Sequence, residues 1–106
     1  MSKSYDSRIF EMLSNYRAIA KQVKEIVRKF DPKAKVYVFG SIVRGRYTGA
    51  SDIDIMVVTE RVDLKYEIMI EVYRSIEAPV ELHVITKEHL EKWYRKFIKP
   101  NEIEEV

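Results

Sequence analysis

The stretch VYVFGSIVRGRYTGASDIDIMVV, residues 36–58, decides the fold. At its start, the apolar run that follows Lys35 predicts a short buried strand over 35–39, closed by Gly40. A second apolar run at 53–59 predicts another strand. Between them, we expect one or two helical turns over 41–46 and a loop over 47–51. The connection is too short for a full crossover, which points to an antiparallel pair in a mixed sheet.

Helical periodicity precedes this stretch. Apolar residues recur at gaps of three and four from about Tyr5 to Phe30, which predicts one long amphipathic helix. Asp31-Pro32 is expected to end it, because the residue before a proline avoids the helical region.

Three further elements are expected after the stretch. Residues 63–76 fit both a strand and a helix, and their length together with Asp63 as a candidate N-cap favours the helix. Residues 80–85 read as a third strand, and Thr86 is a candidate cap for a last helix that runs to about Phe97. An acidic tail begins at Pro100. The alternation predicts an α/β fold with a mixed sheet of three or four strands and helices packed on one face.

Composition narrows the possible functions. The chain has 106 residues, which predicts a single domain spanning 1–106. It contains no cysteine, which excludes disulfides, thiol catalysis and Cys-ligated metals, so a metal would be a hard cation held by carboxylates. The net charge of +2 is too small to indicate nucleic-acid binding by itself. The sequence shows no signal peptide and no membrane span, and we expect a cytoplasmic protein.

Acidic residues on the predicted strands are the first candidate site. Asp52 and Asp54 are two residues apart, so strand alternation turns both toward one side, and a divalent cation between them would relieve their repulsion. Glu81 lies on the third strand and would complete a triad if that strand neighbours the second. His83 shares the face of Glu81 by alternation but is not expected to be a ligand. Taken singly, these acids also fit a solvated strand end.

The turn after the first strand is the second candidate. Gly40 lets a ligand approach the backbone, and Ser41 offers a hydroxyl and an amide where a helix is expected to begin. Arg44 and Arg46 follow within reach of phosphate oxygens. Taken alone, a Gly-Ser pair is more often an ordinary turn with solvated arginines.

Together these signals form a known pattern. Residues 36–58, with Gly40-Ser41, Arg44-Gly45 and the Ser-Asp-x-Asp element at 51–54, resemble the signature of the DNA polymerase β-like nucleotidyltransferase superfamily. More narrowly, the segment looks like the minimal nucleotidyltransferases of bacteria and archaea. The resemblance covers about a quarter of the chain. It implies a palm-like core.

The resemblance also implies a reaction and a set of roles. Such enzymes move a nucleoside monophosphate from a nucleoside triphosphate to a hydroxyl and release pyrophosphate. Asp52, Asp54 and Glu81 would bind two Mg²⁺ ions, and Glu81 would also help to deprotonate the acceptor. Gly40 and Ser41 would hold phosphates, with Arg44 and Ser51 as further nucleotide contacts.

Partners are implied in the same way. Minimal members pair with a helical HEPN-type toxin, for which they act as antitoxin, so ATP is the expected donor and a hydroxyl of that toxin the expected acceptor. A catalytically weak antitoxin that acts by binding, or a transferase for a small molecule or an RNA end, remain alternatives. The apolar residues of the last helix, Trp93, Tyr94, Phe97 and Ile98, are candidates for a partner or homodimer surface, with at least two of them expected to face the core.

Overall fold

The computed structural model describes residues 2–48 and 51–106, with the side chains of all of these except residues 2–7 and 95. Within these residues, four strands form one sheet in the order β3-β2-β1-β4. Their bounds are β1 Lys35–Phe39, β2 Ile53–Val58, β3 Val80–Ile85 and β4 Ile103–Glu105. β1 is antiparallel to β2 and β4, whereas β2 and β3 are parallel. The predicted α/β class and the antiparallel first pair are therefore confirmed.

Two helices precede the sheet where one was predicted. They are α1 (Ser2–Ser14) and α2 (Tyr16–Phe30), and the single helix was wrong at Asn15, whose backbone leaves the helical region at φ −98° and ψ 25°. The Ser14 hydroxyl donates to the Glu11 carbonyl over 2.9 Å, and such a local bond competes with the helical ladder. The amide of Asn15 still reaches Glu11, so the apolar stripe continues in phase through both helices.

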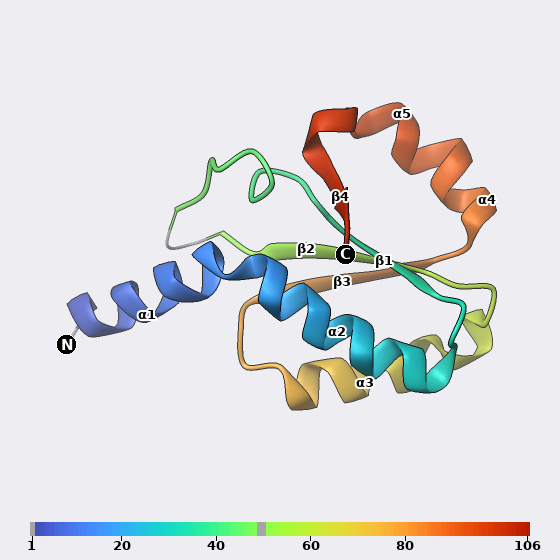
Figure 1. The fold of residues 1–106 in the computed structure, drawn as a ribbon, viewed down its shortest axis with the longest axis horizontal. Coiled ribbons are helices and arrows are strands. Elements are labelled where there is room, and N and C mark those ends of the chain that lie inside the picture. The colour runs from blue at the N-terminus through green and yellow to red at the C-terminus, as the bar shows by residue number, and fades with distance from the viewer. Residues whose placement is uncertain (1, 49–50) are drawn as a thin grey trace.

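The main core lies between these helices, α3 (Lys65–Ser75) and one face of the sheet. β2 contributes Ile53, Ile55 and Val57 to it, the alternation that was predicted, and all three are fully buried. α3 is the crossover between the parallel strands β2 and β3, which places it on this same face. Figure 1 shows α1, α2 and α3 together on one side of the sheet.

A smaller core lies on the other face. It contains Met56, Val58, Ile85 and Leu90. The helical segment above it consists of α4 (Lys87–His89), a wider π-type turn (Leu90–Tyr94) and α5 (Arg95–Phe97). Figure 1 shows α4 and α5 opposite α1, α2 and α3. The prediction that the helices pack on one face therefore holds for α1, α2 and α3 and was wrong for this last segment, because Leu90 packs on the second face of the sheet. The predicted cap is confirmed, because the Thr86 hydroxyl accepts the His89 amide over 3.1 Å.

Two local predictions were wrong. Of the predicted helical turns over 41–46, residues 41–45 form successive turns rather than a helix, because Gly45 takes a positive φ of 72°. Asp63 does not cap α3; a 3-10 turn at Val62–Leu64 precedes that helix, and Asp63 pairs with Arg61. The acidic tail, to which no element was assigned, forms a 3-10 turn at Pro100–Glu102 and then β4 along the edge of β1, which is the fourth strand of the predicted three or four. Of the predicted loop over 47–51, residues 49–50 lie outside the described part.

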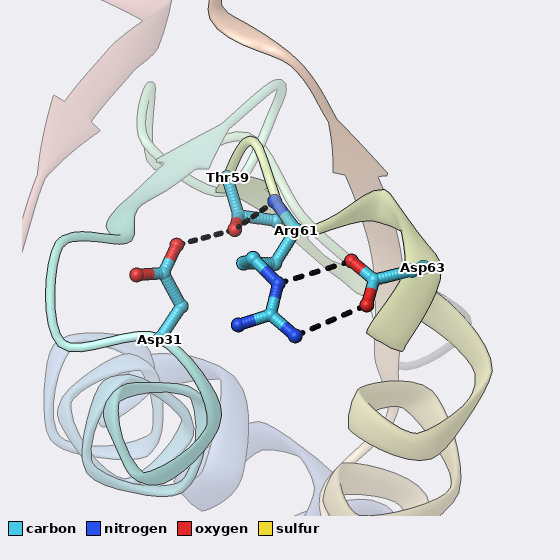
Figure 2. Close-up of polar contacts among 4 residues, drawn as sticks. All are labelled: Asp31, Thr59, Arg61 and Asp63. Atoms are coloured by element: carbon cyan, nitrogen blue, oxygen red, sulfur yellow. Dashed lines mark hydrogen bonds and ion pairs between the residues drawn. The ribbon is translucent and has the colours of Figure 1, made fainter.

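A chain of polar contacts joins the end of α2 to the end of β2 (Figure 2). The buried Thr59 hydroxyl donates to the Asp31 carboxylate and accepts the Arg61 amide over 3.0 Å. The Arg61 guanidinium continues the chain to Asp63 with two bonds of 3.1 Å. The hydrogen bond from Thr59 lowers the pKa of Asp31. These contacts fix the end of β2 that lies farthest from the predicted acidic site.

Within residues 2–48 and 51–106, each helix is too short or too polar to cross a lipid bilayer.

Candidate active site

The site begins with the pairing of two parallel strands. Asp54 of β2 stands opposite Glu81 of β3, so the third strand neighbours the second as required for a shared acidic site. The side chains of Asp54, Glu81 and His83 each offer a donor atom, and these atoms lie within 4.8 Å of one another. The backbone of two adjacent strands therefore holds two carboxylates and an imidazole in one group.

Asp52 lies outside this group. It precedes β2, whose first residue is Ile53, and its side chain is exposed. The backbone of Asp52 is not paired with a neighbouring strand, and none of the described contacts directs its carboxylate toward Asp54 and Glu81. It is nevertheless close enough for its charge to raise the pKa of Asp54. Its predicted part in metal binding stays a prediction.

The surroundings of Asp54 disfavour the charged form of its carboxyl. The pKa of this carboxyl rises from 3.8 to about 6, first because burial removes water from the charged form. A hydrogen bond with Glu81 and the charges of Glu81 and Asp52 raise it further. A cation bound between these carboxylates would remove both the repulsion and the desolvation penalty, so the donor set fits a divalent metal.

The turn after β1 packs directly on Asp54. Gly40 has φ +89°, and a Cβ built on it would lie 3.0 Å from the Asp54 carboxylate oxygen Oδ2. The backbone conformation therefore favours glycine here, and any larger residue would also press on the Asp54 carboxylate. Ser41 follows, exposed, and its carbonyl accepts the amides of Arg44 and Arg46 over 3.1 and 3.0 Å. The predicted phosphate turn thus lies beside the acidic group.

The 3-10 turn at 100–102 supports this turn from behind. The Gly40 amide donates to the Glu102 carbonyl over 2.8 Å, and the Arg44 guanidinium pairs with the Glu102 carboxylate over 3.0 Å. Sequence reasoning missed Glu102, because an acid in a tail carries no signal until β4 brings it to β1. Arg44, predicted to reach phosphates, is held by this carboxylate, and Arg46 is exposed.

Ser51 closes the loop that leads into β2. Its hydroxyl accepts the Thr48 amide over 2.9 Å, and its own amide donates to the Thr48 carbonyl over 3.0 Å. These bonds fix where the chain enters β2. The described contacts of Ser51 are with this loop, and its role as a nucleotide contact remains a prediction.

His83 was set aside on sequence grounds, yet it belongs to the group. Its Nε2 lies 3.9 Å from Glu81 Oε1, and its Nδ1 lies 3.3 Å from the Tyr94 hydroxyl. Burial raises the pKa of Tyr94, and the charge of Glu81 adds to this. The sequence signal that could have identified His83 was strand alternation, which places residues 81 and 83 on the same face of β3.

An apolar groove borders the group on the side of α4 and α5. Its aromatic lining includes Phe39, Trp93, Tyr94 and Phe97. Tyr94 packs on the smaller core, as does Ile98, which confirms that two of the four apolar residues of this helical region face inward. Trp93 and Phe97 are 60% and 75% exposed and stack with ring centroids 6.4 Å apart.

Comparisons with known proteins agree with this geometry. The profile of the family described as nucleotidyltransferase domain matches residues 20–105. One similar crystal structure, of a protein assigned as a nucleotidyltransferase, shares 30% identity at a TM-score of 0.65 and covers 81% of this chain and 95% of its own. Another, assigned likewise and from Sulfolobus solfataricus, shares 30% identity at a TM-score of 0.58, with coverages of 79% and 78%.

A more distant likeness shows the fold alone. Cid1, in complex with its short product ApU, shares 19% identity at a TM-score of 0.52 and covers 85% of this chain but 36% of its own. Curated protein sequences yield no match.

Proposed function

Because this chain belongs to the nucleotidyltransferase family, we propose that its acidic group binds Mg²⁺ with ATP and transfers AMP to a hydroxyl. The observation that carries the proposal is the pairing of Asp54 with Glu81 directly beside the Gly40-Ser41 turn. A triphosphate held at that turn would present its α-phosphorus to the carboxylates and to any cation between them.

The position of each acidic residue suggests its role in the reaction. Asp54 and Glu81, joined by Asp52 when a cation draws it in, would hold two Mg²⁺ ions. Bound there, such ions stabilise the charge on the attacking and leaving oxygens. Glu81 is exposed and is the carboxylate that an incoming hydroxyl would meet, so it would accept the proton. The acceptor oxygen bonds to the α-phosphorus, the α–β phosphoanhydride bond breaks, and pyrophosphate leaves.

The phosphates would rest on the turn after β1. Ser41 is exposed there and offers its hydroxyl, and the bond of the Gly40 amide to Glu102 keeps the turn in place. Arg44 would contact phosphate only by loosening its pair with Glu102, an exchange of one anion for another. Ser51 would contact the nucleotide from the loop before β2.

For the acceptor, we propose a tyrosine hydroxyl on a HEPN-type toxin, in the cytoplasm. Support comes from the resemblance of residues 36–58 to minimal antitoxin members and from the exposed Trp93 and Phe97 beside the acidic group. Exposed stacked aromatics of this kind suit a protein interface. The same surface would also serve a homodimer. The alternatives are an antitoxin that acts by binding alone and a transferase for a small molecule or an RNA end.

A labelling experiment separates these readings. The protein is incubated with α-labelled ATP, Mg²⁺ and the toxin, alongside Asp54→Asn and, as a matched control, Asp63→Asn, which changes an exposed carboxylate that pairs with Arg61. Label on the toxin that disappears only with Asp54→Asn supports the proposal. Neutralisation of the toxin by Asp54→Asn, without label, supports binding alone, and label on RNA or a small molecule without toxin supports the third reading.

A further inference from the structure

The imidazole of His83 is the one donor of the acidic group that the proposed roles leave unused. Resting on the proposed function, we propose that His83 is a ligand of the metal held by Asp54 and Glu81, which gives this chain a mixed oxygen and nitrogen site. Such a site would bind Mn²⁺, Co²⁺ or Zn²⁺ in preference to Mg²⁺.

The backbone places the imidazole where a ligand is needed. Strand alternation puts Glu81 and His83 on one face of β3, and the parallel register sets Asp54 opposite Glu81. His83 Nε2 is 3.9 Å from Glu81 Oε1, which is too long for a hydrogen bond. Two ligands of one ion, each about 2.0–2.2 Å from it, lie up to about 4 Å apart, so the separation suits a shared cation.

The other ring nitrogen is already engaged. Nδ1 lies 3.3 Å from the Tyr94 hydroxyl, whose oxygen can accept the Nδ1 proton. That tautomer leaves the lone pair on Nε2, the nitrogen that faces Glu81. Histidine ligands of metals are usually oriented by such a partner on the second nitrogen. The ring of Phe39, edge-on to His83 at 5.3 Å, restricts rotation of the imidazole.

The ligand type decides the preference among metals. Mg²⁺ favours oxygen ligands and retains its waters, so an imidazole adds little to its binding. Imidazole suits Zn²⁺ and other first-row transition metals, whose affinities rise from Mn²⁺ through Co²⁺. A site of two carboxylates and one imidazole therefore differs from one built on carboxylates alone in the ratio of Mn²⁺ to Mg²⁺ affinity.

The test measures metal binding directly. The full chain is loaded with Mn²⁺, and pulsed EPR detects the nuclear modulation of a coordinated imidazole nitrogen. Because the sequence has only 2 histidines, His83→Gln and His89→Gln assign the signal without ambiguity. Calorimetric titrations with Mn²⁺ and Mg²⁺ follow for both variants, with circular dichroism as the check on folding. Tyr94→Phe, which keeps the ring and removes only the hydroxyl, serves if His83→Gln does not fold.

We expect the nitrogen signal in the wild type and in His89→Gln, and its loss in His83→Gln. In His83→Gln the Mn²⁺ affinity should fall at least about tenfold, with a much smaller change for Mg²⁺. Tyr94→Phe should weaken Mn²⁺ binding in the same direction. A wild-type protein that binds Mn²⁺ without a nitrogen signal, or an unchanged Mn²⁺ to Mg²⁺ ratio in His83→Gln, would overturn the inference and leave the carboxylate site standing. Failure of the wild type to bind either metal would instead overturn the proposed function.

Discussion

Substitution of Asp54 by Asn should stabilise the metal-free protein above neutral pH. The carboxyl has a pKa of about 6 in the fold against 3.8 ordinarily, so the folded state holds a proton that the unfolded chain releases. For a raised carboxyl pKa, the contribution to stability is present below pH 3.8 and is lost as the pH rises through 6. At pH 7.5 the wild type therefore carries a cost that the neutral amide removes.

The size of this cost follows from the shift and the exposure. A rise of about two pKa units corresponds to about 3 kcal/mol. Because Asp54 is only partly buried, screening by solvent reduces this to about 1–2 kcal/mol. Asn has nearly the same shape, so its packing against the Gly40 turn should be retained.

Urea unfolding in EDTA at pH 4, 5, 6 and 7.5 measures the effect. We expect the two proteins to diverge between about pH 4 and 6, with Asp54→Asn the more stable and the difference constant above that range, and added Mg²⁺ to stabilise only the wild type. Asp31→Asn is a control of opposite sign, because the lowered pKa of Asp31 contributes stability above pH 4 that is lost on acidification. If Asp54→Asn is less stable than the wild type at pH 7.5, the electrostatic account of the site is refuted.

Three further outcomes are expected. Gly40→Ala should lower the free energy of unfolding by about 1–2 kcal/mol and abolish nucleotide binding in a titration, because an L residue is strained at φ +89°; unchanged binding would contradict the close approach to the metal site. Thr59→Val should cost about 1–2 kcal/mol at pH 7 and less as the pH falls toward 3, since the lost bond is to the charged form of Asp31; a pH-independent cost would contradict this. Burial, and then the hydrogen bond to Glu104, raises the pKa of Tyr16 to about 12, so the difference in phenolate absorbance between wild type and Tyr16→Phe should have its midpoint near 12, and a midpoint near 10 would rule the burial out.

Much of the fold was predictable because its signals are local. The apolar alternation of β2 and the Thr86 cap follow from neighbours within a few residues. The pairing of Asp54 with Glu81 depends on which strands are adjacent, so it could be predicted only as a condition. The same alternation also placed His83 on the correct face. Its contact with Tyr94 was not visible, because that depends on how the last helical segment packs over the sheet.

The features that were missed depend on distant partners. β4 has only three residues and two of them are acidic, so it carries no strand pattern, and the exposed backbone of β1 supplies its hydrogen bonds. Glu102 enters the site only through that pairing. The break at Asn15 was concealed because the apolar stripe crosses it in phase, and periodicity does not register a single residue outside the helical region.

The hydrogen bonds that join Asp31, Thr59 and Arg61 affect metal binding at the opposite end of β2. The hydrogen bond from Thr59 to Asp31 ties the end of β2 to the end of α2, so β2 cannot shift along its axis relative to its neighbours. Asp54 therefore keeps its position opposite Glu81 and beside the Gly40 turn. An incoming ion then meets ligands that are already in place, and little of its binding energy goes into ordering the protein. Loosening the anchor should therefore weaken ion capture from the far side of the molecule, without altering any atom that touches the ion.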